Sequence, residues 1–66
     1  MKINNTVIRD NVIQGYSVNK DLDTDVLSIY LDSGITIVIR SDGKFGLSMS
    51  LLDFKQALVE LEHLLP

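Results

Sequence analysis

Alternation of hydrophobic and polar positions predicts antiparallel strands in the middle of the chain. Residues 26–31 and 35–40 are rich in β-branched side chains and alternate in polarity, so each is expected to form a strand. Between them, residues 32–34 read Asp-Ser-Gly, and glycine at the third position is typical of a three-residue hairpin loop. Residues 41–43 read Ser-Asp-Gly and precede a third strand over 44–49. The three strands are therefore predicted to form a meander.

The length of the two loops decides which side chains share a face of this meander. With three-residue loops, Ile37 lies between Ile29 and Leu47 of the neighbouring strands. Ile35 then lies opposite Met49 in the second hairpin. A two-residue second loop would turn every side chain of the last strand to the other face. We therefore predict three-residue loops and one apolar face made by Leu27, Ile29, Leu31, Ile35, Ile37, Ile39, Phe45, Leu47 and Met49.

Two strands with weaker patterns are expected ahead of the meander, over residues 4–9 and 12–18. The Asp-Asn pair between them suits a two-residue turn and would place Ile8 opposite Ile13. Gly15 predicts a bulge or the close approach of another backbone. The sequence leaves open whether this hairpin pairs within its own chain or exchanges with a neighbouring copy.

A polar segment over residues 19–25 is predicted to be a loop between the two hairpins. Its carboxylates alternate at Asp21, Asp23 and Asp25, and oxygens in that pattern can converge on calcium. Val26 stands where a calcium loop needs glycine, so a solvated acidic loop is favoured. An acidic surface that contacts a basic patch on a partner is the third interpretation, and it stays open.

The carboxyl-terminal part of the chain is predicted to be a helix over residues 51–65. Ser50 followed by Asp53 resembles a capping box. The apolar stripe of this helix recurs at three- and four-residue spacing and consists of Leu51, Phe54, Ala57, Leu58, Leu61, Leu64 and Leu65. We predict one domain over residues 1–66 with an α+β fold. Its mostly antiparallel sheet of about five strands combines a β-hairpin with the meander, and the helix packs on one face.

Some apolar side chains have no place in this core. One helix cannot cover both faces of a sheet, so the outer sheet face stays uncovered, and the outer side of the helix adds a further apolar pair. Scattered apolar residues are normal on a surface, but a contiguous patch marks an interface, and a symmetric dimer is the commonest form. We predict self-association or partner binding through Val26, Tyr30, Val38, Arg40, Leu52 and Val59.

Composition narrows the functional classes. The chain has 66 residues and no cysteine, which excludes disulfides, thiolate metal sites and a cysteine nucleophile. Its net charge is −3 and its pI is about 4.7, which argues against sequence-independent binding of nucleic acid. A chain this short is marginally stable, which favours a partner. We expect no signal peptide and no membrane span, and hence a cytoplasmic protein. Small proteins of phages and mobile elements commonly have this size and composition.

No group of residues predicts catalysis, a cofactor or a metal. His63 is the only histidine, and without a second ligand or a neighbouring nucleophile it is expected to be a surface residue. The carboxylates are not spaced for acid–base work. Arg9, Arg40 and Lys44 all lie near predicted turns and could gather at one end of the sheet, where they would bind an anion.

Two functional hypotheses follow, and no enzyme is expected. The first is a small non-enzymatic binding protein, a homodimer that engages or inhibits a macromolecular partner through the surplus apolar surface. The alternative is an oligomer that sequesters a small anionic ligand, such as a nucleotide, between subunits through Arg9, Arg40 and Lys44. The first depends on apolar and acidic side chains, and the second depends on bases near the turns.

Overall fold

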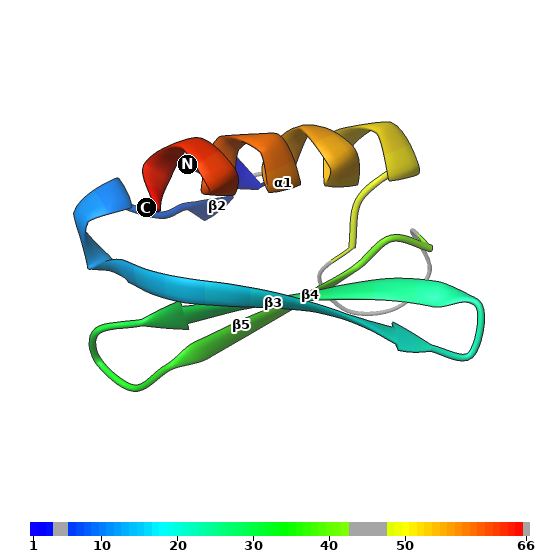
Figure 1. The fold of residues 1–66 in the computed structure, drawn as a ribbon, viewed down its shortest axis with the longest axis horizontal. Helices are drawn as coiled ribbons and strands as arrows, with labels where there is room; N and C mark the ends of the chain where they lie inside the picture. Colours follow the sequence, from blue (N-terminus) through cyan, green and yellow to red (C-terminus); the bar gives the residue numbers. More distant parts are fainter. Residues whose placement is uncertain (4–5, 43–47, 66) are drawn as a thin grey trace.

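Three antiparallel strands and one helix form the two layers of the structure, which is a computed structural model. The sheet consists of β3 (Ile13–Asp21), β4 (Thr24–Leu31) and β5 (Thr36–Arg40), in the order β3-β4-β5. Helix α1 (Leu51–Leu64) lies over one face of this sheet (Figure 1). The α+β class and the carboxyl-terminal helix are confirmed.

The amino-terminal segment forms a second, smaller sheet beside the helix (Figure 1). Strands β1 (Lys2–Ile3) and β2 (Thr6–Val7) pair antiparallel, and a short 3-10 helix, η1 (Asp10–Val12), leads into β3. Ile3 and Ile8 are buried in the common core, which ties this segment to the helix layer. The structure describes residues 1–3, 6–42 and 48–65.

The predicted loop over residues 32–34 is confirmed together with its register. Ile29 lies opposite Ile37 across β4 and β5. The Leu31 amide donates to the Ile35 carbonyl at 2.9 Å, which closes a three-residue loop. Gly34 has a φ of 85°, the left-handed conformation that favours glycine at this position.

The predicted hairpin over residues 4–9 and 12–18 is wrong. β2 pairs with β1, whereas β3 pairs with β4 through a two-residue turn at Leu22 and Asp23. The segment expected to be a loop is thus the end of two strands. Its polar residues suit this ladder, because Lys20 faces Asp25 across the strands and opposite charges there are favourable. The bulge predicted at Gly15 is present, since the β3–β4 register shifts between Ile13 and Gly15.

The predicted second hairpin of the meander is also wrong where the structure describes it. Met49 was expected opposite Ile35, but its amide donates to the Arg40 carbonyl, and Arg40 and Ser48 form a parallel bridge. The chain therefore runs alongside the end of β5 on its way to the helix. Ile35, which was predicted to lie on the buried face, is exposed. The predicted positions of Phe45 and Leu47, and most of the strand over 44–49, lie outside the described residues.

The core lies between the sheet and the helix. Ser50 caps the helix as predicted, because its Oγ accepts from the Asp53 amide at 3.2 Å. Of the predicted helix stripe, Leu51 is exposed, since it lies in the first turn at the margin of the sheet. The buried apolar side chains come from every layer and are Ile3, Ile8, Ile13, Leu27, Ile29, Ile39, Met49, Phe54, Ala57 and Leu61.

Two glycines should respond in opposite ways to a methyl group. A Cβ at Gly15 would lie 3.7 Å from Tyr30 Cδ2, an ordinary contact, and the φ of Gly15 is not positive. Gly15→Ala should therefore raise the free energy of unfolding by about 0.4–1 kcal/mol through the unfolded chain. Gly34→Ala should lower it by about 1–2 kcal/mol, because it forces the left-handed conformation on alanine. Urea unfolding measures both, and a shared sign would contradict this account.

Leu22 occupies the turn position that suits glycine best. Its φ is 58° and its side chain is 92% exposed. Among the described residues it is the one non-glycine with a positive φ. A two-residue turn with a positive φ at its first central position favours glycine at that position. Leu22→Gly should raise the unfolding free energy by about 0.5–1 kcal/mol. Leu22→Ala is the control, since it removes the exposed side chain and keeps the strain. Equal stabilisation by both variants would assign the effect to the side chain.

Candidate functional site

The outer face of the sheet, opposite the helix, carries most of the predicted partner-binding residues. The register brings Val38 opposite Ser28 and Val26 opposite Arg40, so these side chains share the face with Tyr30. Tyr30 is 42% exposed and Val38 is 50% exposed. We call Val26, Tyr30, Val38 and Arg40 the outer patch.

Tyr30 contacts strand β3. Gly15 lies opposite it, and a Cβ built at Gly15 would be in ordinary contact with the ring, 3.7 Å from Tyr30 Cδ2. The Tyr30 hydroxyl and Ser17 Oγ are 2.7 Å apart and share a hydrogen bond. Because Ser17 is two residues beyond Gly15, the tyrosine lies diagonally along β3. Sequence reasoning missed this support, since it paired β3 with the wrong strand.

Arg40 is engaged by two carboxylates of its own chain. Its Nη1 donates to Asp21 Oδ2 at 3.0 Å, and its Nε donates to Asp42 Oδ2 at 3.1 Å. These contacts raise the pKa of the Arg40 guanidinium above its ordinary value, with the bond to Asp21 as the larger cause. Arg40 thus lies at one end of the outer patch, and both carboxylates orient its guanidinium.

Leu52 and Val59 lie on a different surface from the outer patch. Both are exposed on α1, whereas the outer patch lies on the sheet face that the helix does not cover. The two layers in Figure 1 separate these surfaces. The six predicted partner-binding residues therefore divide into a sheet group of four and a helix pair, and a flat partner would meet one group at a time.

The basic residues proposed for anion binding do not gather where the structure describes them. Arg9 lies ahead of β3, where its carbonyl accepts from the Val12 amide. Arg40 pairs with Asp21 at the other end of the same strand. A nine-residue strand at about 3.3 Å per residue separates the two ends by roughly 25 Å. Lys44, the third member, lies outside the described residues.

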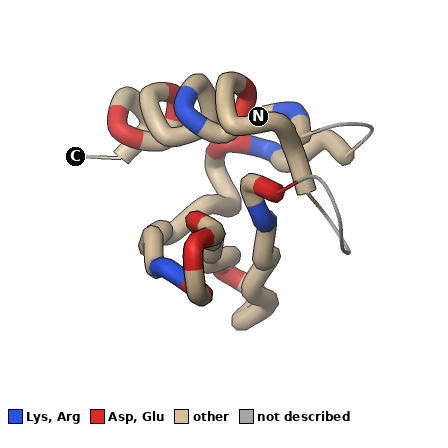
Figure 2. Tube along the Cα trace, turned by 90° about the vertical axis from the view of Figure 1, so that its right-hand side faces the viewer, with Lys and Arg blue, Asp and Glu red and all other residues tan. Residues whose placement is uncertain are grey.

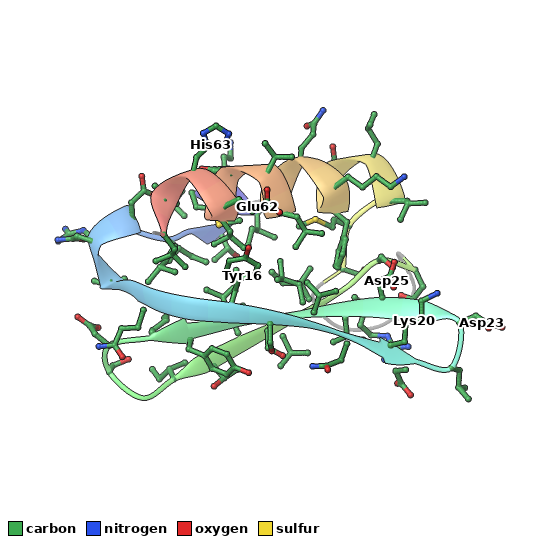
Figure 3. All side chains as sticks on the ribbon, in the orientation of Figure 1. Tyr16, Lys20, Asp23, Asp25, Glu62 and His63 are labelled. Atoms are coloured by element: carbon green, nitrogen blue, oxygen red, sulfur yellow. The ribbon has the colours of Figure 1, made fainter. Side chains whose placement is uncertain are left out.

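The β3–β4 turn and the strand ends beside it carry Asp21, Asp23 and Asp25, and we call this segment the acidic hairpin. It forms the end of the sheet that faces the viewer in Figure 2. Asp23 lies at its tip, and Asp25 and Lys20 lie on the two strands behind it (Figure 3). Within residues 1–3, 6–42 and 48–65, no three His, Asp or Glu side chains are grouped to hold a metal ion. His63 points away from the sheet, on the last turn of the helix (Figure 3).

A depression of about 270 Å³ opens between the amino-terminal segment and the helix. Polar groups of Lys2, Asp53, Gln56 and Glu60 surround an apolar floor. Lys2 is far from the helix in sequence, so no sequence signal could have joined it to the other three.

Comparison with protein-family models, with curated proteins and with solved structures gave no match to this chain. Its function must therefore be inferred from its own residues. In the described part of the chain, no helix has the length and apolar character needed to cross a membrane.

The Tyr30–Ser17 hydrogen bond can be measured by a double-mutant cycle. Tyr30→Phe and Ser17→Ala each remove one partner of the same bond, so each should lower the unfolding free energy by about 0.5–1.5 kcal/mol. The double variant should lose little more than either single one, because the bond is already gone. Chemical denaturation gives all three values. Strictly additive losses would show that the two hydroxyls do not stabilise each other.

Proposed function

We propose that this chain is a small, non-enzymatic, cytoplasmic binding protein that works as a homodimer and engages or inhibits a macromolecular partner. The partner contacts the outer patch on the sheet. The observation that carries this proposal is the exposure of Tyr30 and Val38 on a sheet face that no described element covers.

The outer patch has the chemistry of a protein interface. Tyrosine and arginine are the residue types most enriched where binding energy concentrates. The Tyr30 hydroxyl is hydrogen-bonded to Ser17, and the Arg40 guanidinium is paired with Asp21 and Asp42. Side chains that are ordered before binding lose less entropy when a partner arrives. The patch therefore supports binding better than a set of mobile surface residues would.

Charge indicates which kind of partner fits. The chain has a net charge of −3, and the acidic hairpin borders the Arg40 end of the outer patch. A protein surface with an apolar centre and a basic rim complements this arrangement. Nucleic acid does not, since its phosphates would meet carboxylates.

The alternative of ligand sequestration has less support. The guanidinium of Arg40 already donates to Asp21 and Asp42, and Arg9 lies at the other end of β3. An anion held by both arginines would need groups from more than one copy. No observation favours that arrangement over binding through the outer patch.

The proposal is tested by moving one charge between two surfaces. Val38→Lys should abolish capture of a partner from a cell extract, because it places an unpaired charge in the outer patch. Val59→Lys is the matched control on the helix. The proposal expects a captured species that wild type and Val59→Lys retain equally and that Val38→Lys loses at least tenfold. Capture that is indifferent to Val38→Lys, or lost only with Val59→Lys, would contradict it.

A further inference from the structure

Strand β3 forms one edge of the three-stranded sheet, and it is the longest strand of the structure. Its partner is β4 alone, and in the described ranges no strand pairs along its other side. Figure 1 shows β3 as the near strand of the sheet. An exposed strand edge presents backbone donors and acceptors that can pair with another chain.

Hydrogen bonds of β4 show which groups of β3 point outward. The Leu31 amide donates to Ile35, and the Asp25 carbonyl accepts from the Ser41 amide, so these two residues of β4 bond toward β5. Residues of an antiparallel strand alternate between its two neighbours, so Tyr30 and Ser28 bond toward β3. The backbone groups of their partners on β3 therefore point inward. The residues of β3 between those partners direct their N–H and C=O groups to the free edge, and they are Tyr16, Val18 and Lys20.

The opposite edge of the sheet, strand β5, has fewer backbone groups available for pairing. By the same alternation, Thr36, Val38 and Arg40 are the residues of β5 that point outward. The Arg40 carbonyl already accepts from the Met49 amide, so the carboxyl end of that edge is occupied. β3 therefore carries the longer run of free backbone groups.

We propose that two copies of this chain pair β3 against β3, antiparallel, about a two-fold axis at Val18. This inference rests on the proposed homodimer and says which edge forms it. Val18 then faces Val18 of the second copy, and Tyr16 faces Lys20 of the second copy on either side of the axis. All three outward-pointing residues thus form hydrogen-bonded pairs, and the two sheets become one continuous sheet.

The charged side chains favour this register over the registers with the axis at Lys20 or Tyr16. With the axis at Val18, Lys20 lies opposite a tyrosine and Asp21 lies opposite Gly15, so no like charges face each other. An axis at Lys20 would oppose two lysines, which is unfavourable. An axis at Tyr16 would place Lys20 opposite Val12, beyond the bulge.

The burial pattern agrees with this pairing. Val18 is 43% exposed at the sheet edge, on the face that carries the helix. Tyr16 packs partly against the core and projects from β3 toward the helix layer (Figure 3). A second copy would cover the exposed part of Val18 and would accept and donate hydrogen bonds to the outward backbone groups of β3. It would also place two outer patches on one continuous face, which suits a partner that is itself symmetric.

The pairing is tested by light scattering over a concentration series, on wild type and on variants that place a positive or a negative charge at residue 18. Wild type should show twice the 7.4 kDa mass of one chain. Val18→Lys and Val18→Glu should each weaken dimerisation at least tenfold, because each places like charges opposite each other. Mixing the two variants should restore the dimer, since lysine then faces glutamate. Thr36→Lys, at an outward position of the β5 edge, is the matched control and should remain dimeric.

A second measurement keeps the result independent of the charged variants. The chain has no cysteine, so Val18→Cys introduces a single thiol that should form a cross-linked dimer on mild oxidation, whereas Thr36→Cys should not. A monomeric wild type, a dimer indifferent to Val18→Lys, or equal cross-linking at both positions would overturn the inference. A monomer whose partner capture still depends on Val38 would overturn the homodimer together with its edge, and would leave partner binding through the outer patch standing.

Discussion

A single 14-residue helix can cover only one face of a three-stranded sheet, and the rest of the molecule depends on that constraint. Leu27, Ile29 and Ile39 are fully buried beneath the helix because they alternate onto the covered face. Alternation of side chains along a strand then sends the intervening residues to the uncovered face. Tyr30 and Val38 are exposed there as a consequence of the same register that builds the core. Core and candidate site are thus two results of one pairing.

The β4–β5 hairpin could be predicted from sequence because two independent signals agreed. The Asp-Ser-Gly loop requires a left-handed third residue, and Gly34 adopts that conformation. The same loop length places Ile29 opposite Ile37 on the buried face. A local turn preference and a burial pattern that point to one register leave little freedom. The helix was predictable for a similar reason, since Ser50 and the buried Phe54, Ala57 and Leu61 agree on its start and its face.

The other strand pairings were predicted wrongly, because those predictions used only a local turn signal. Asp10 and Asn11 suit a tight turn, yet they form a short 3-10 helix, and β3 continues to a turn at Leu22 with a positive φ. Leucine is a poor turn residue, so sequence rules pass over this position. The longer β3–β4 ladder is preferred because it extends over nearly all of both strands, including the Lys20–Asp25 pair. Local propensity did not show that polar residues could continue a strand.

The placement of three candidate residues on the outer sheet face could be predicted, but the contacts that they make could not. Tyr30, Val38 and Arg40 follow from alternation along β4 and β5. Their hydrogen-bond partners Ser17 and Asp21 come from β3, and no signal could connect them before the β3–β4 pairing was known. The same pairing directs the backbone of Tyr16 and Val18 outward, because every inward group on β3 is matched by β4. The strand that hydrogen-bonds the tyrosine on one face is therefore also the strand whose edge joins the second copy in the proposed dimer, so the proposed dimerisation and the proposed partner binding both depend on β3.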